Sequence, residues 1–330
     1  MSRPDLTVIV VSWNVRELLL DCLRSVRDTR GALDVEVVVV DNASSDGSVE
    51  ALARQAPEAR VLALDRNVGF PAANNVGLEH AGGRHVLLLN PDTVVGAGTL
   101  EACVAALDAD PALGAVGCRL EYPDGRLQKE CGRRAYRLRH LVWEAFYLNA
   151  LLPAHPVFAH QLMGDWPHTD DRDVEALSGA FLMVRRDALD QVGGLPEDLF
   201  MYHEDLALCQ RLQALGWRLR CLGSVSTVHH GGASASRSAS PLELLEGEVR
   251  TRLIRERSGP VAGGAARLLF GFRQVVRTAL AVLVHLPGLA GVRRRYPVVA
   301  NVGKHARLLA WTVAPSWALR DVPRPVRRAS

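Results

Sequence analysis

The chain has 330 residues, of which 48% are apolar and 23% are charged, a balance that excludes an intrinsically disordered protein. This length allows one large domain with an appendage, or two small domains. The net charge of +3 hides an asymmetry, because residues 241–330 carry a net charge of +11 and residues 1–240 a net charge of −8. Such a basic tail suggests contact with an anionic surface, either membrane lipid headgroups or nucleic acid. Ordinary solvated helices are the alternative.

The six cysteines are scattered along the chain and include no Cys-x-x-Cys pair. This spacing argues against a zinc ribbon or a disulfide framework and fits a reducing cytosol. A strand-like run follows Met1 within a few residues, so we expect no signal peptide and a cytoplasmic location.

Short apolar runs rich in β-branched residues alternate with helical patterns in the first third of the chain. We expect strands at 7–11, 35–40, 61–64 and 85–89, and helices near 18–26, 49–53 and 72–79. This alternation predicts βαβ units, and therefore an α/β fold with a mostly parallel, Rossmann-like sheet flanked by helices. In such sheets ligands bind just beyond the carboxyl ends of the strands.

The pattern continues to about residue 230 with one interruption. A helix at 100–107, a strand at 114–117, an ordered stretch at 176–184, a helix near 205–215 and strands at 218–222 and 226–229 are expected. Residues 131–173, rich in Arg, His, Pro and aromatics, are interpreted as an insertion or flexible loop. A Gly/Ser/Ala-rich linker at 231–240 then separates two regions of different character. We therefore expect a catalytic domain at 1–235 and a basic, amphipathic helical region at 236–330.

The apolar stretch 265–286 gathers its polar residues on one side of a helical wheel. They are Arg267, Arg273, Gln274, Arg277 and His285. Its longest charge-free part, 278–292, is shorter than the ~20 apolar residues that a spanning helix needs. An interfacial amphipathic helix beside the cluster Arg293–Arg295 fits the pattern. A buried helix pair that covers the catalytic domain fits it equally.

Polar residues follow the first three strands where a nucleotide would bind. Ser12 and Asn14 end the first strand, and Asp41 ends the second. The Asp41 carboxylate at a strand end could accept a hydrogen bond from the N–H of a pyrimidine ring. Gly69 offers a flexible backbone for a close approach, while Asn67 would bind the nucleotide or cap the following helix, which contains Asn74 and Asn75.

Asn90-Pro91-Asp92 ends the most apolar strand of the chain. A carboxylate at this edge is costly unless it is paired or binds a cation. Hard divalent ions prefer oxygen ligands and bridge phosphate oxygens. Asp92 is therefore a candidate metal ligand, and the alternative is a plain turn with Asp92 as a helix cap.

Two later clusters bear side chains suited to catalysis. Glu204 and Asp205 begin a predicted helix, and Asp205 leans to its buried side, where it could accept a proton from an acceptor hydroxyl. A cap at the helix N-terminus is the other interpretation. His229 and His230 end a strand before a glycine pair, which favours a metal or phosphate role.

Seven motifs in this order resemble the family 2 glycosyltransferases, and most closely their rhamnosyltransferase-like branch. They are Val-Ser-Trp-Asn at 11–14, Asp-Asn-Ala-Ser-Ser-Asp-Gly-Ser at 41–48, Asn-Val-Gly-Phe at 67–70, Leu-Asn-Pro-Asp-Thr at 89–93, Ser-Gly-Ala-Phe-Leu-Met-Val at 178–184, Phe-Met-Tyr-His-Glu-Asp at 200–205 and His-His-Gly-Gly-Ala-Ser at 229–234. Each motif alone is weak, but the ordered set is specific. The resemblance covers roughly residues 5–235.

The resemblance implies a GT-A fold and an inverting, metal-dependent transfer of a sugar, with rhamnose as one candidate, from a dTDP- or UDP-linked donor. Asp41 would contact the base, and Asp92 would hold Mg²⁺ or Mn²⁺ on the diphosphate. Asp205, beside Glu204, would be the base that deprotonates the acceptor. His229 fits the family's His-x-x-Gly-x-Ser position better than His230. The implied acceptor is a polysaccharide or glycolipid at the cytoplasmic membrane face, and nucleic acid is not an expected partner.

The sequence departs from the family pattern at two points. Only one carboxylate stands in the motif at 90–92, so metal binding would be weak or would need His229, and Ala207 occupies a position where the branch often has a second acid. A nucleotidyltransferase would need a basic, glycine-rich loop after the first strand, which Ser12–Arg16 does not supply. A non-catalytic, membrane-bound scaffold that keeps only the nucleotide site is the remaining alternative.

Overall fold

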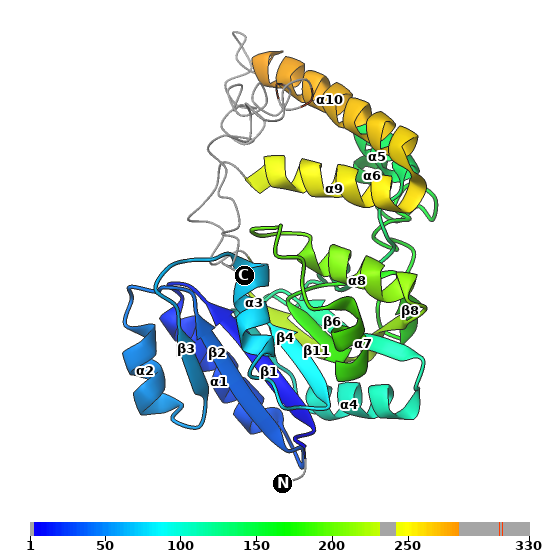
Figure 1. Cartoon of the computed structure of the whole chain (residues 1–330). Helices are drawn as coiled ribbons and strands as arrows, with labels where there is room; N and C mark the ends of the chain where they lie inside the picture. The colour runs from blue at the N-terminus through cyan, green and yellow to red at the C-terminus, as the bar shows by residue number, and fades with distance from the viewer. Residues whose placement is uncertain (1–2, 232–241, 284–309, 311, 313–330) are drawn as a thin grey trace. The chain divides into compact units, whose positions relative to one another are not determined.

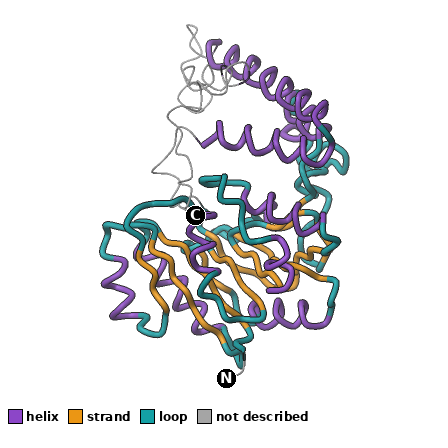
Figure 2. Tube along the Cα trace, in the orientation of Figure 1, coloured by secondary structure: helices purple, strands orange, loops and turns teal. Residues whose placement is uncertain are grey.

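The computed structural model describes residues 3–231, 242–283, 310 and 312, which form two compact units (Figures 1 and 2). The first unit contains residues 3–135 and 162–231, and the second contains residues 136–161, 242–283, 310 and 312. The predicted domain boundary at 235/236 lies outside the described residues and stays a prediction.

The first unit is built on a sheet of nine strands among the described residues, in the order β3-β2-β1-β4-β10-β6-β11-β5 with β8 beside β11. Strands β1 (Leu6–Ser12), β2 (Val35–Asp41), β3 (Arg60–Ala63) and β4 (His85–Leu89) are parallel. All seven residues of β1 are buried, as expected for a β-branched run covered on both faces. The predicted α/β fold is therefore confirmed.

The other half of the sheet is mixed. Strand β10 (Phe181–Arg185) runs antiparallel between β4 and β6 (Leu113–Glu121). Strand β11 (Arg218–His229) is parallel to β6 and antiparallel to β5 (Thr93–Val95) and β8 (Arg172–Val174). The two strands expected at 218–222 and 226–229 form one strand with an irregularity between them.

Helices flank the sheet (Figure 1). They are α1 (Arg16–Thr29), α2 (Ser48–Gln55), α3 (Phe70–Leu78), α4 (Thr99–Ala109), α7 (Arg186–Val192) and α8 (Glu204–Ala214). Helix α1 is typical: its buried residues include Leu19, Cys22 and Val26, which recur at helical spacing. Burial of these apolar stripes orders the turns that carry the polar residues at the strand ends.

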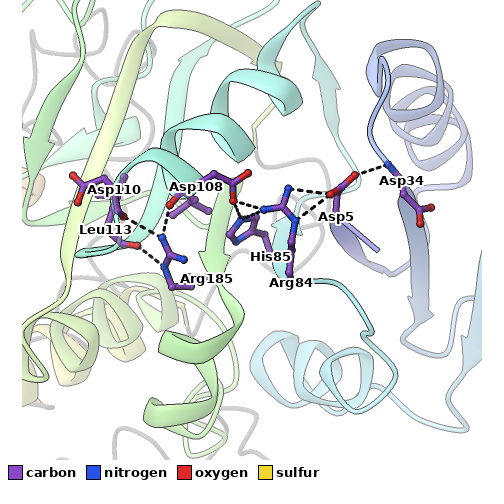
Figure 3. Close-up of polar contacts among 9 residues, drawn as sticks. Asp5, Asp34, Arg84, His85, Asp108, Asp110, Leu113 and Arg185 are labelled. Carbon is purple, nitrogen blue, oxygen red and sulfur yellow. Dashed lines mark hydrogen bonds and ion pairs between the residues drawn. The ribbon is translucent and has the colours of Figure 1, made fainter. Parts of the chain in front are cut away.

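Charged side chains fasten the amino ends of the central strands to one another (Figure 3). Arg84 contacts the carboxylates of Asp5, at 2.9 Å, and of Asp108. The buried His85 places Nε2 2.9 Å from the Asp108 carboxylate. Arg185, at the end of β10, donates to the carbonyl oxygens of Asp110 and Leu113. These contacts at the amino edge join the start of β4 to Asp5 before β1 and to Asp108 of α4, and join β10 to the start of β6, away from the carboxyl ends of the parallel strands.

Residues 131–173, expected to form an insertion or a flexible loop, contain regular helices and strands. After the short helix η1 (Lys129–Cys131), β7 (Gly132–Arg133) pairs with β9 (Ala176–Leu177) in a separate two-stranded sheet. Trp166 and His168 are buried, and their rings stack at 3.8 Å. Helices α5 (Leu138–Ala145) and α6 (Leu148–Leu151) belong to the second unit.

The second unit contains α9 (Leu242–Ser258) and α10 (Pro260–Leu283), which pack against each other, while α10 also packs on α5. The Glu144 carboxylate lies 3.1 Å from Arg250 and 3.0 Å from Arg273. No helix within the described ranges has the length and apolar character needed to cross a bilayer. The expected helix at 265–286 is confirmed as part of α10, whereas His285 and Arg293–Arg295 lie outside the described residues.

Candidate active site

A pocket of about 480 Å³ opens in the first unit beyond the carboxyl ends of β1, β2 and β4. Six of the predicted site residues line it: Asn67, Asn90, Asp92, Glu204, Asp205 and His229. The other five do not line it, namely Ser12, Asn14, Asp41, Gly69 and Asn74. Trp13, Asn42 and Phe70, the sequence neighbours of four of them, do line the pocket, and Asn74 donates to the carbonyl oxygen of Phe70.

Strand pairing brings Asp92 and His229 together although 136 residues separate them. Asp92 directly precedes β5, and the register of β5 with β11 pairs Thr93 with His229. The Asp92 side chain is nearly buried, and its Oδ1 lies 3.3 Å from Nε2 of His229. Asn90 Nδ2 is 3.4 Å from the same imidazole nitrogen. His230 is exposed and its backbone N–H donates to the carbonyl oxygen of Asp92, whereas His229 places its imidazole against the Asp92 carboxylate.

Gln128, which the sequence analysis did not single out, sets the orientation of His229. Gln128 is 6% exposed, and its amide nitrogen donates to the carbonyl oxygen of His229 at 2.6 Å. Its Oε1 must then accept the hydrogen bond from Nδ1 of His229, at 2.8 Å. In the neutral imidazole Nε2 therefore carries a lone pair and points it at the Asp92 carboxylate.

Two electron-rich atoms that face each other at 3.3 Å suit a shared divalent cation. Among the described residues, no group of three or more His, Cys, Asp or Glu side chains could hold a metal ion. A cation on Asp92 and His229 would therefore take its remaining ligands from phosphate or water oxygens. The pair fits a metal that arrives with a phosphorylated ligand.

Two carboxylates at the start of α8, Glu204 and Asp205, also line the pocket. Tyr202 and His203 have φ of 70° and 62°, a left-handed conformation that turns the chain sharply into the helix. Oδ2 of Asp205 accepts hydrogen bonds from Nη2 of Arg133, at 2.9 Å, and from the backbone N–H of Gly179, at 3.1 Å. Both bonds fix the orientation of a carboxylate that lines the pocket.

Glu204 differs from its neighbour in its environment. Its side chain is 8% exposed, and within the described structure Oε2 has no hydrogen-bond partner. Burial, followed by the nearby charge of Asp205, raises the pKa of Glu204 to about 8. Burial therefore favours the protonated form of Glu204, whereas Asp205 has hydrogen bonds that hold its carboxylate toward the pocket, the arrangement expected of a proton acceptor.

Within the described structure, three buried polar atoms at the ends of β1 and β2 and in α3 have no hydrogen-bond partner. Oδ2 of Asp41 accepts from the backbone N–H of Ser44 at 2.9 Å, but its Oδ1 is buried and has no partner in the described part of the chain. Ser12 Oγ and Asn74 Oδ1 are in the same state, and all three residues are at most 2% exposed. An unpaired buried polar atom costs roughly 1–3 kcal/mol, so such a cluster is expected where a ligand supplies the missing bonds.

Asn14, Asn67 and Gly69 hold the loops of this site. Asn14 Oδ1 accepts from the backbone N–H of Ser45 at 2.7 Å. Asn67 Oδ1 accepts from the Gly69 N–H and from the side chain of Asn42, both at 3.0 Å. Gly69 has φ of 88°, and a Cβ there would lie 2.6 Å from the carbonyl oxygen of Phe200. The close approach predicted for Gly69 is thus made by another segment of the same unit.

Comparison with known proteins places these features in a family. A family model described as glycosyl transferase family 2 matches residues 7–193. N-acetylglucosaminyl-diphospho-decaprenol L-rhamnosyltransferase of Mycobacterium tuberculosis is 31% identical over 217 residues, 62% of this chain and 69% of that protein. The O-antigen biosynthesis protein RfbC of Myxococcus xanthus is 29% identical over 249 residues, 73% of this chain and 18% of that protein.

Among solved structures, the mannosyltransferase PcManGT of Pyrobaculum calidifontis, in complex with GDP-Man and Mn²⁺, has a similar fold. The TM-score is 0.56 at 21% identity, and the match covers 96% of this chain and 88% of that one. This likeness confirms the predicted fold class, and the sequence matches confirm the rhamnosyltransferase-like resemblance.

Proposed function

Because this chain belongs to glycosyltransferase family 2, we propose that it transfers a sugar from a nucleotide diphosphate donor, with inversion and with the help of a divalent metal. One observation carries the proposal. The Asp92 carboxylate faces the imidazole of His229 at 3.3 Å in the pocket that Asp205 also lines, so a site for a phosphate-bound cation and a proton acceptor share one cavity.

The nucleotide of the donor would occupy the edge formed by β1 and β2. Oδ1 of Asp41 is buried and lacks a partner among the described residues, and it could accept the ring N–H of uracil or thymine. Ser12 and Asn74 offer two further buried oxygen atoms that have no hydrogen-bond partner among the described residues. These atoms support a UDP- or dTDP-linked donor. Trp13 and Asn67 would line the path from the base to the sugar, since both line the pocket.

The metal, Mg²⁺ or Mn²⁺, would be held by Asp92 and His229, with Gln128 keeping Nε2 of His229 free to bind it. When bound, the cation would offset the negative charge that develops on the departing nucleotide diphosphate. Asn90 would add a polar contact from the same turn, because its amide nitrogen lies 3.4 Å from the imidazole. The mannosyltransferase of similar fold was solved with Mn²⁺, which supports this choice of ion.

Asp205 would remove the proton from the acceptor hydroxyl as that oxygen attacks the anomeric carbon from the side opposite the diphosphate. Direct displacement inverts the configuration at that carbon. Arg133 and the Gly179 N–H would hold the carboxylate in place by binding a single oxygen, Oδ2. Burial favours the protonated form of Glu204, which would add no second negative charge next to the base.

The acceptor would be a glycolipid or a polysaccharide, with rhamnose as one candidate for the sugar. The relative from Mycobacterium tuberculosis is named as an L-rhamnosyltransferase acting on N-acetylglucosaminyl-diphospho-decaprenol, a lipid-linked sugar. A chain with an acceptor of this kind would work at the cytoplasmic face of the membrane, as a peripheral protein. The basic character of residues 241–330 supports such a location.

The donor is tested by thermal unfolding of the full chain with UDP- and dTDP-sugars, each with and without Mn²⁺. We expect one nucleotide class to raise the melting temperature only when Mn²⁺ is present, by an amount that follows the ligand concentration. The Asp41→Asn variant should lose about tenfold in affinity for that nucleotide. Equal stabilisation by all nucleotides with and without metal would contradict the proposed site. Nucleotide binding without sugar transfer to any acceptor would favour the alternative of a non-catalytic, membrane-bound scaffold.

A further inference from the structure

Helix α10 has its polar side turned inward and its apolar side turned outward. Gln274 is 1% exposed, and Arg273 reaches the nearly buried carboxylate of Glu144. By contrast, every exposed position of α10 whose side chain is described is apolar or glycine. These positions are Pro260, Val261, Gly264, Leu268, Phe272, Val275, Ala279 and Val282. A helix that faced water would show the opposite arrangement, with its polar residues outside.

The large side chains among these positions form a continuous surface, which we call the α10 stripe. It consists of Val261, Leu268, Phe272, Val275 and Val282, which are 85%, 72%, 44%, 49% and 51% exposed. Their spacings of seven, four, three and seven residues keep them on one side of the helix over about 30 Å. Phe146, itself 55% exposed, extends the stripe, because its ring lies 5.6 Å from that of Phe272.

An ion network inside the second unit allows α10 to keep this orientation. Glu144 of α5 accepts from Arg250 of α9, at 3.1 Å, and from Arg273 of α10, at 3.0 Å. The Arg250 guanidinium also lies over the ring of Tyr136, 4.4 Å from its centre. Rotating α10 to bury the stripe would expose Gln274 and separate Arg273 from Glu144. A buried pair that loses one partner is strongly destabilising, so the network fixes the stripe on the outer side.

The charge of the region identifies what would cover the stripe. Helix α10 contains three arginines and no acidic residue, and residues 241–330 carry a net charge of +11. A second copy of the chain would bring the same positive charge to the contact, which opposes pairing, whereas an anionic bilayer supplies the opposite charge and an apolar interior. We infer that the α10 stripe inserts into the interface of a membrane that contains anionic lipid.

This inference rests on one part of the proposed function, namely that the acceptor is linked to a lipid. It adds the surface of the protein that contacts the membrane. From the sequence, the polar residues gather on one side of the helical wheel, and both an interfacial helix and a buried helix pair fit that pattern. In the structure, Arg273 binds Glu144 and Gln274 is buried, and the interfacial contact is made by Leu268, Phe272 and their neighbours.

The full chain should float with vesicles of phosphatidylcholine and phosphatidylglycerol, and much less with phosphatidylcholine alone. The double variant Leu268→Glu/Phe272→Glu should bind at least about tenfold less, since it removes two insertable side chains and adds negative charge. Leu215→Glu is the matched control, because Leu215 is 52% exposed in the first unit, and it should bind like the wild type. Equal loss in the control variant would overturn the assignment to α10.

A second measurement does not depend on how well the glutamate variant folds. All six native cysteines are buried, so a Phe272→Cys variant can be labelled selectively with an environment-sensitive fluorophore. Its emission should shift to shorter wavelength with the anionic vesicles. An unchanged spectrum while the protein floats would overturn the inference, as would a concentration-dependent dimer of the wild type that the double glutamate variant abolishes. The assay contains no nucleotide, so failure of the donor site would not affect it.

Discussion

The two edges of the sheet in the first unit satisfy their polar groups in different ways. At the amino edge, Arg84 binds both Asp5 and Asp108, and His85 also contacts Asp108 (Figure 3). At the carboxyl edge, several buried polar atoms have no partner in the described ranges: Ser12 Oγ, Asp41 Oδ1, Asn74 Oδ1, Arg133 Nε and Glu204 Oε2. At the amino edge of the described structure, Nδ1 of His85 also lacks a partner.

This difference shows how one sheet divides stability and function between its ends. Paired charges at the amino edge need nothing from outside the protein. The unpaired atoms at the carboxyl edge are costly in the free protein, and a ligand that pairs them recovers that cost as binding energy. Substitutions at the two edges should therefore have different consequences, with activity affected at one and stability affected slightly at the other.

The largest expected effect is that of Asp205→Asn at the carboxyl edge. The amide cannot accept the acceptor proton, so we expect sugar transfer to fall by about 10²–10⁴-fold. Nucleotide affinity should not change, because the predicted base contact is made by Asp41. Radiolabelled sugar transfer measures the first quantity and thermal shift the second. Transfer at the wild-type rate would remove Asp205 from the role of base.

Gln128→Leu should have the next largest effect, on metal affinity. Without Gln128 neither the tautomer nor the ring orientation of His229 is fixed, and we expect Mn²⁺ affinity in the presence of nucleotide to fall by about 10–100-fold. Gln128→Glu keeps an acceptor for Nδ1 and should lose less. Titration followed by electron paramagnetic resonance of Mn²⁺ measures this without any turnover. Identical Mn²⁺ affinity in the leucine variant and the wild type would show that Gln128 only supports the fold.

These two variants illustrate what the sequence could predict and what it could not. Asp205, Asp92 and Asp41 follow from local patterns, since each stands where a predicted strand or helix meets a turn. Gln128 and Arg133 were missed because Gln128 precedes η1 and Arg133 lies in β7, and these elements span only three and two residues, too short to show a period. Arg133 reaches Asp205 only after β7 pairs with β9, a contact between distant segments.

A similar limit applies to the second unit. The apolar period of residues 265–286 predicted a helix, which the structure contains as part of α10. A helical wheel separates polar from apolar residues, but it does not say which side packs on the protein. That choice is made by Glu144 of α5, which lies more than a hundred residues earlier in the chain and binds Arg273. The orientation of α10 therefore required the tertiary structure.

Glu204→Gln should change the pH dependence of stability. Burial raises the pKa of Glu204 in the folded protein to about 8 from an ordinary value of 4.5. Between these pH values Glu204 therefore lowers the free energy of unfolding by an amount that grows as pH rises. The variant should therefore gain stability relative to the wild type from pH 5 to pH 8, by up to a few kcal/mol. Urea unfolding at several pH values measures the difference. A difference that stays constant with pH would mean that Glu204 is not protonated in the folded protein.

The smallest effect is expected for Asp108→Asn at the amino edge. The side chains of Asp108 and Arg84 are 41% and 37% exposed, so water screens the pair and the loss should be below about 1 kcal/mol. Burial raises the pKa of Asp108, but hydrogen bonds from Arg84 and His85 outweigh this and lower it below 3.8. The loss should thus be present at neutral pH and disappear as the wild-type carboxylate is protonated below that value. Because the amino edge lies away from the pocket, sugar transfer should be unchanged. A drop in sugar transfer comparable to that of Asp205→Asn would contradict the claim that the amino edge serves stability and the carboxyl edge serves activity.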